Sequence, residues 1–150
     1  MTQLFSAPLL HQAALLITAL RQRDLTLATA ESCTGGLLAG LLTEIPGASD
    51  VYRGGVVCYA NSEKVRLGVA ATLIEQHGAV SAPVAVALAE AIRAATGADI
   101  GLATTGIAGP GGGSPEKPTG LVFMACAWQE TTVVQQIFPG DRTEIGRAHV

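Results

Sequence analysis

Length, composition and charge exclude several classes of protein. The chain has 150 residues, enough for one domain with its own core, and 49% of them are hydrophobic. Only 14% are charged and the net charge is −3, which argues against a nucleic-acid binder that neutralises phosphates with a basic face. No uncharged apolar run reaches the ~18–20 residues of a membrane span, so we expect a cytoplasmic protein without a membrane partner.

Helical and strand patterns alternate along the chain. The predicted helices cover residues 8–22, 37–42, parts of 63–78, and 81–96. The predicted strands cover residues 25–30, 51–60, 100–105, 120–128 and 133–138. Strands that alternate with helices and are apolar on both faces predict one α/β domain over residues 1–150, a three-layer α/β/α sandwich. A short turn at 129–132 predicts that the last two strands form a hairpin, which makes the sheet mixed.

The C-terminal segment departs from this pattern. Residues 140–143 begin a helix, but residues 144–150 do not continue its pattern. We therefore expect a non-native tail over about residues 144–150. On this interpretation the natural chain continues as a helix that is truncated here.

A long glycine-rich loop, GIAGPGGGSPEKPT, joins two predicted strands at residues 106–119. Its five glycines allow backbone N–H groups to approach a ligand closely, while Pro110, Pro115 and Pro118 stiffen the loop. These features favour a cradle for an anion or nucleotide, although the loop matches neither GxxxxGK[ST] nor a well-placed GxGxxG. The alternative is a solvated crossover loop.

A second candidate site is the strand-to-helix turn ESCTGG at residues 31–36. Its backbone N–H groups lie at the positive end of the following helix. Ser32 and Thr34 could simply cap that helix. Alternatively, Ser32 is a nucleophile and the N–H groups of residues 33–36 form an oxyanion hole.

Lysine is rare in this chain, since only Lys64 and Lys117 are lysines among nine basic residues. Unlike arginine, a desolvated lysine can lose its proton near neutral pH and act as a base. Lys64 follows a predicted strand in YANSEK, and Lys117 lies in the glycine-rich loop. Ser32, Tyr59 and Lys64 at strand ends therefore suggest an acyl-transfer site. The cysteines Cys33, Cys58 and Cys126 lack metal-ligand spacing, so we expect reduced thiols, no metal and no cofactor.

Several segments together resemble one family. AESCTGG, GGVVCYANSEK, HGAVS, DIGLATTGIAGPGGGSPEKPTG and FPGDR, taken in this order, are similar to the C-terminal domain of the CinA competence/damage-inducible proteins. Stand-alone members resemble nicotinamide-nucleotide amidases. The resemblance covers residues 25–142 and does not include the large N-terminal domain of two-domain members, so we expect no pyrophosphatase activity.

The resemblance implies hydrolysis of the amide of nicotinamide mononucleotide to nicotinate mononucleotide and ammonia. It implies a serine nucleophile at Ser32, with Tyr59 and Lys64 from the YxNxxK motif as its catalytic partners. The base is Lys64, acting directly or through Tyr59. The expected substrate-binding residues are Glu31, Cys33, Thr34, Gly35, Gly36, Asn61, Thr105, Gly106, Gly109, Gly111, Gly112, Gly113, Lys117 and Arg142.

Two alternatives remain open at this point. A nucleotide-sensing or partner-binding module would keep the pocket with little turnover, and a deamidase of another small amide would keep the mechanism. Against the first, all three chemical residues are present. The expected partner is a small-molecule nucleotide, and a homo-oligomer is compatible with the sequence.

Overall fold

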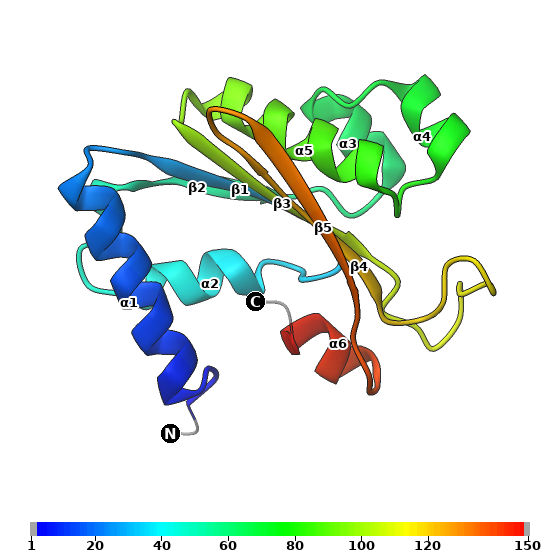
Figure 1. Cartoon of the computed structure of the whole chain (residues 1–150), viewed down its shortest axis with the longest axis horizontal. Coiled ribbons are helices and arrows are strands. Elements are labelled where there is room, and N and C mark those ends of the chain that lie inside the picture. The colour runs from blue at the N-terminus through cyan, green and yellow to red at the C-terminus, as the bar shows by residue number, and fades with distance from the viewer. Residues whose placement is uncertain (1–2, 149–150) are drawn as a thin grey trace.

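A five-stranded sheet separates two layers of helices (Figure 1). The computed structural model describes residues 3–148, with side chains described to residue 146. The strands are β1 (Leu27–Glu31), β2 (Tyr52–Val57), β3 (Ile100–Gly106), β4 (Leu121–Ala127) and β5 (Thr131–Ile137). The helices are α1 (Ala7–Gln22), α2 (Leu37–Thr43), α3 (Asn61–Leu67), α4 (Ala71–His77), α5 (Ala82–Thr96) and α6 (Arg142–Ala148). None of the described helices is both long and apolar enough to cross a membrane.

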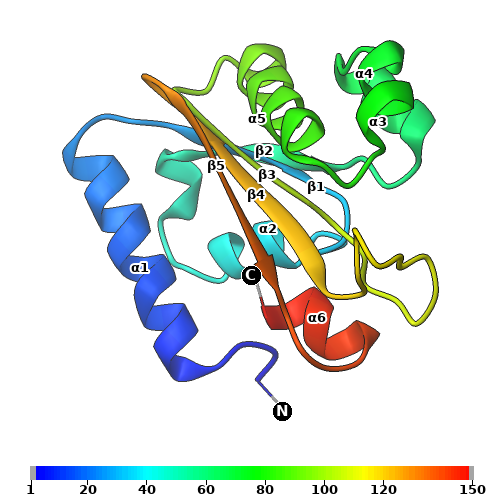
Figure 2. The same ribbon diagram turned by 45° about the vertical axis from the view of Figure 1, so that its right-hand side comes forward.

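The sheet is mixed, as predicted. Its strand order is β2-β1-β3-β4-β5, with β1 parallel to both of its neighbours. β4 pairs antiparallel with β3 and with β5, so the predicted hairpin is confirmed. α1 and α2 cover one face, and α3, α4 and α5 cover the other (Figures 1 and 2). This arrangement confirms the α/β/α sandwich.

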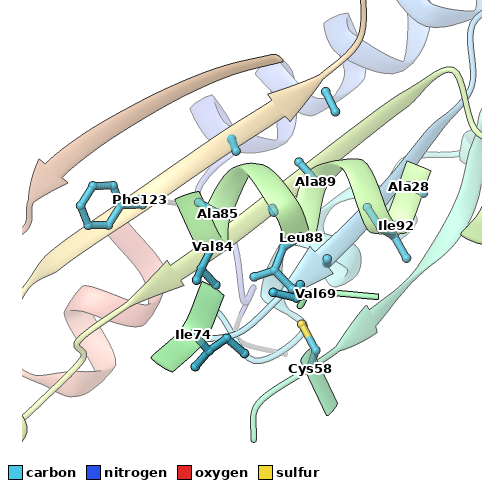
Figure 3. Close-up of a cluster of buried hydrophobic side chains, with 14 of the residues drawn as sticks. Ala28, Cys58, Val69, Ile74, Val84, Ala85, Leu88, Ala89, Ile92 and Phe123 are labelled. Atoms are coloured by element: carbon cyan, nitrogen blue, oxygen red, sulfur yellow. The ribbon is translucent and has the colours of Figure 1, made fainter. Parts of the chain in front are cut away.

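The larger core lies between α5 and the sheet (Figure 3). Proline within the first turn and the Ser81 hydroxyl, which accepts from the Val84 N–H, begin α5, and Gly97 ends it in the left-handed conformation. Small residues on the sheet allow the helix to approach closely: a Cβ on Gly101 would lie 2.1 Å from the Ala89 carbonyl oxygen. The fully buried apolar face of α5 comprises Val84, Ala85, Leu88, Ala89 and Ile92. Burying each Val, Leu or Ile there contributes about 1.5–3 kcal/mol.

The structure differs from the prediction over residues 51–60 and 63–78. Helical patches over 63–78 form two short helices, because Gly68 ends α3 with φ of +130°. The predicted strand over 51–60 is shorter, since β2 ends at Val57. Beyond it, the carbonyls of Cys58 and Tyr59 both accept hydrogen bonds from the Lys64 ammonium or amine nitrogen instead of a neighbouring strand.

The C-terminal helix also differs from expectation. α6 runs from Arg142 to Ala148, so the expected loss of helix at residue 144 is wrong within the described residues. The physical reason is packing, because Ile145 is 1% exposed and contacts a small cluster with Ala108 and Val122. Residues 149–150 lie outside the described residues, and a non-native tail stays a prediction.

Candidate active site

The carboxyl ends of the three parallel strands place the candidate residues together. Ser32 directly follows β1, Tyr59 lies two residues beyond β2, and Gly106 ends β3. β1 lies between the other two strands. The chain leaves it through α2 on one face and enters β3 through α5 on the opposite face (Figure 2). Such a switch point is where α/β sheets commonly form ligand sites.

A pocket of about 260 Å³ opens at this switch point. Its volume is slightly below the usual ~300–1,000 Å³ range of small-molecule sites. Eleven of the predicted site residues line it: Ser32, Cys33, Tyr59, Asn61, Lys64, Thr105, Gly106, Gly109, Gly111, Gly112 and Arg142. The structure therefore brings together most of the residues that were predicted from separate motifs.

Lys64 is the most unusual side chain of the pocket. It is only 1% exposed, although it extends from the short helix α3. Its Nζ lies 3.1 Å from the Ser32 Oγ, 2.8 Å from the Cys58 carbonyl oxygen and 2.8 Å from the Tyr59 carbonyl oxygen. None of these partners is a carboxylate.

This environment favours a neutral Lys64. Burial lowers the pKa of Lys64 below its usual range, because the site desolvates the ammonium without an opposing carboxylate. A neutral amine has two N–H groups and one lone pair. The two carbonyls can only accept and match the two N–H groups, so the lone pair can face the Ser32 hydroxyl. That arrangement is what a general base for Ser32 requires.

Tyr59 lies in the pocket wall, with its side chain 58% exposed. The Tyr59 hydroxyl accepts a hydrogen bond of 2.5 Å from Arg142, which also donates to the Gly109 carbonyl at 2.7 Å. Lys64 contacts the Tyr59 carbonyl rather than its ring. Direct proton transfer from Ser32 to Lys64 therefore fits these contacts, whereas the Tyr59 hydroxyl is bound to Arg142 and not to Ser32 or Lys64.

The glycine-rich loop forms one side of the pocket. Gly109, Gly111 and Gly112 line it, and Gly109 adopts φ of +74° where a Cβ would lie 2.5 Å from Thr119. Gly113 was predicted to bind substrate but does not line the pocket, and a Cβ at this position would lie 2.8 Å from the Thr119 backbone nitrogen. Lys117 is a second correction: its Nζ donates to the His77 carbonyl at 2.6 Å, at the C-terminus of α4. It joins the loop to α4 instead of facing the pocket.

The turn after β1 also requires a correction. Glu31 was predicted to bind substrate, but its carboxylate accepts from the N–H groups at the start of α2 and from Thr34. Thr34, Gly35 and Gly36 likewise lie outside the pocket lining. The Gly35 N–H donates to the Ser32 carbonyl, and the Gly36 N–H donates to Glu31. These two N–H groups are engaged and do not serve the expected oxyanion hole.

Cys33 borders Ser32 in the pocket and packs against the cluster beneath α6. Burial raises the pKa of its thiol to about 11. The thiol therefore stays protonated at neutral pH and is a poor nucleophile. Within the described residues, no group of three or more His, Cys, Asp or Glu side chains gathers as a metal site would.

Sequence reasoning missed four lining residues. Ile107 and Ala108 lie in the glycine-rich loop but were passed over in favour of its glycines. Ala79 and Val80 line the pocket from the connection between α4 and α5, and the Thr105 hydroxyl donates to the Ala79 carbonyl at 2.9 Å. The available signal for this connection was the HGAVS segment, which resembled the family, but its two lining residues have small apolar side chains that suggest no chemistry.

Known proteins match both the sequence and the fold. The CinA C-terminal domain family matches residues 10–150. A CinA-like protein from Gemmatimonas aurantiaca is 53% identical over 135 residues, covering 89% of this chain and 32% of that protein. Another from Anaeromyxobacter sp. is 55% identical over 134 residues, covering 88% and 33%. The chain thus spans about a third of the length of these curated relatives.

Solved structures agree with this assignment. The competence/damage inducible protein CihA from Agrobacterium tumefaciens matches with a TM-score of 0.91 and 41% identity, covering 99% of this chain and 92% of that one. A competence-damaged (CinA) superfamily protein from Escherichia coli matches with a TM-score of 0.91 and 31% identity, covering 98% and 87%. The chain belongs to the CinA C-terminal domain family.

Proposed function

We propose that this chain hydrolyses the carboxamide of nicotinamide mononucleotide, giving nicotinate mononucleotide and ammonia. The observation that carries the proposal is the buried Lys64 with its Nζ 3.1 Å from the Ser32 Oγ. A lysine kept from water without a carboxylate in contact is costly for folding and valuable for proton transfer. The substrate follows from the family resemblance, and the amidase chemistry follows from the Ser32–Lys64 pair.

The proposed reaction has two halves. The neutral Lys64 amine accepts the Ser32 proton while Oγ attacks the carboxamide carbon, forming a tetrahedral intermediate. The ammonium of Lys64 then returns this proton to the departing amide nitrogen, so that ammonia leaves and Ser32 carries the acyl group. Lys64 next takes a proton from water, the hydroxide attacks the ester, and the proton returns to Oγ as the acid is released.

Arg142 and the glycine-rich loop complete the proposed substrate site. Arg142 lines the same pocket as Ser32 and Lys64 and is the one arginine among the lining residues that the structure describes. Its planar donors suit a phosphate, and the backbone of Gly109, Gly111 and Gly112 leaves room for the ribose phosphate to approach. The ring carboxamide would then be directed to Ser32.

An ammonia-release assay tests this proposal. Purified protein is incubated with nicotinamide mononucleotide, nicotinamide riboside, nicotinamide and NAD, each with and without EDTA. The proposal expects release from the mononucleotide, a much lower rate without the phosphate, and no loss with EDTA. Calorimetric binding of the mononucleotide without ammonia release would instead indicate a nucleotide-sensing module. Release from another amide alone would retain the mechanism and reject the substrate.

A further inference from the structure

Glu31 is a buried charge that the reaction does not use. Its side chain is 1% exposed and lies outside the lining of the pocket, although it directly precedes Ser32. A carboxylate removed from water is destabilising unless its oxygens are well satisfied. Glu31 therefore needs an explanation other than substrate binding.

The carboxylate of Glu31 is saturated by donors from the turn that carries Ser32. Its Oε2 accepts from the Thr34 hydroxyl at 2.5 Å, the Gly36 N–H at 3.0 Å and the Leu38 N–H at 3.1 Å. Its Oε1 accepts from the Ala39 N–H at 2.8 Å. Charge-assisted hydrogen bonds to the Glu31 carboxylate thus hold the turn that follows Ser32 and the first turn of α2 in one fixed arrangement.

The backbone of Glu31 reaches the other half of the catalytic pair. Its carbonyl accepts from the Cys58 N–H at 2.9 Å, and the Cys58 carbonyl in turn accepts from the Lys64 Nζ at 2.8 Å. Thr34 extends the network, because its hydroxyl also lies 2.9 Å from the Thr104 hydroxyl on β3. One residue therefore connects the turn that holds Ser32 to the segment that holds Lys64.

We propose that Glu31 is a positioning residue, whose carboxylate fixes the Ser32 turn so that the Ser32 Oγ stays in contact with the Lys64 Nζ. This role rests on the proposed Ser32–Lys64 chemistry, though not on the identity of the substrate. Replacing one carboxylate oxygen with an amide NH₂, as in Glu31→Gln, sets a donor against the N–H groups of α2. The turn then loses its fixed geometry, and a misplacement of ~1 Å can cost on the order of a hundredfold in rate.

The test uses a fluorophosphonate that labels activated serines, so that it is independent of any natural substrate. Labelling is followed by intact mass spectrometry, with Ser32→Ala as the blank and circular dichroism to choose a temperature at which each variant is folded. Glu44→Gln, an exposed carboxylate at the C-terminal end of α2, is the matched control. We expect Glu31→Gln to label at least tenfold more slowly than the parent and Glu44→Gln to stay within twofold.

A second readout separates positioning from a general loss of structure. With an amide that the parent protein hydrolyses as substrate, Glu31→Gln should lower kcat. KM should stay within about threefold, since the substrate pocket itself is unchanged. Should Glu31→Gln not fold, Thr34→Val removes one donor to Oε2 and is expected to slow labelling at least threefold.

The outcomes are distinguishable. A folded Glu31→Gln that labels within twofold of the parent overturns the positioning role, as does a Thr34→Val with an unchanged rate when the first variant does not fold. A parent that labels at Ser32 but releases no ammonia from nicotinamide mononucleotide rejects the proposed substrate and leaves the positioning role intact. A parent that does not label at Ser32 rejects the serine chemistry on which both depend.

Discussion

Replacing Lys64 with arginine separates a base from a mere cation. Arginine keeps a positive charge but stays protonated throughout the working range, because its pKa exceeds ~12. Arginine cannot accept the Ser32 proton. Its larger guanidinium group must also fit into the space where the Lys64 Nζ has three contacts of 2.8 to 3.1 Å. We expect Lys64→Arg to lose at least about a hundredfold in kcat, the usual scale for losing a general base, or about 2.7 kcal/mol of transition-state stabilisation.

Stopped and continuous ammonia-release assays across pH measure this effect. The parent rate should rise with pH through the lowered pKa of Lys64, because only the neutral amine accepts the proton. Lys64→Met should lose activity to a similar extent, and the rising limb should be missing from both variants. Lys117→Arg is the matched control, since Lys117 contacts the His77 carbonyl outside the pocket and should retain the parent pH profile. A folded Lys64→Arg with near-normal turnover and an unchanged pH profile would refute the Ser32–Lys64 mechanism, and Tyr59 would become the next base to test.

Further predictions address the nucleophile, the phosphate, the loop and stability. Ser32→Ala should abolish turnover and leave substrate affinity within about tenfold; an active, folded variant would return Ser32 to a structural role. Arg142→Met should raise KM at least tenfold for the mononucleotide and little for the riboside, and equal effects on both would reject a phosphate contact. Lys117→Met should change kcat little, because the side chain does not line the pocket; a hundredfold loss would restore it as a site residue. At pH values between the lowered pKa of Lys64 and ~10.4, Lys64 is protonated in the unfolded state but not in the folded state. The free energy of unfolding of the parent should therefore rise with pH in this window relative to that of Lys64→Met, which urea titrations would measure. A difference that stays constant with pH would contradict the lowered pKa.

The sequence predicted the three layers and the mixed sheet, because these depend on apolar periodicity, but it did not predict the order of the strands in the sheet. The β4–β5 hairpin and the apolar face of α5 follow directly from alternating and helical patterns. The resemblance to the CinA family implied a shared site for Ser32, Lys64 and Arg142, and all three line one pocket. Ser32 and Lys64 meet because they follow the neighbouring parallel strands β1 and β2, whereas Arg142 reaches the pocket from α6, after the antiparallel strand β5.

Side-chain partners were harder to predict, because they depend on tertiary contacts. Nothing local indicates that Glu31 turns toward α2, while Ser32 beside it faces the pocket. Lys117 likewise reaches a carbonyl 40 positions away, so its charge in the loop suggested a phosphate contact that the fold does not provide. Ala79 and Val80 contribute shape and backbone alone, and residue type gave no sign of them.

The charge state of Lys64 tests the central claim most directly. The chain contains two lysines, so a sample labelled with ¹³Cε-lysine gives two signals, and Lys117→Arg assigns them. Chemical shifts followed against pH by NMR report each pKa without substrate or turnover. The account predicts that the Lys64 signal titrates clearly below ~10.4, at or near the midpoint of the rising limb of activity. A Lys64 signal that titrates at or above that value would mean a protonated ammonium at working pH, which would contradict its role as the base for Ser32.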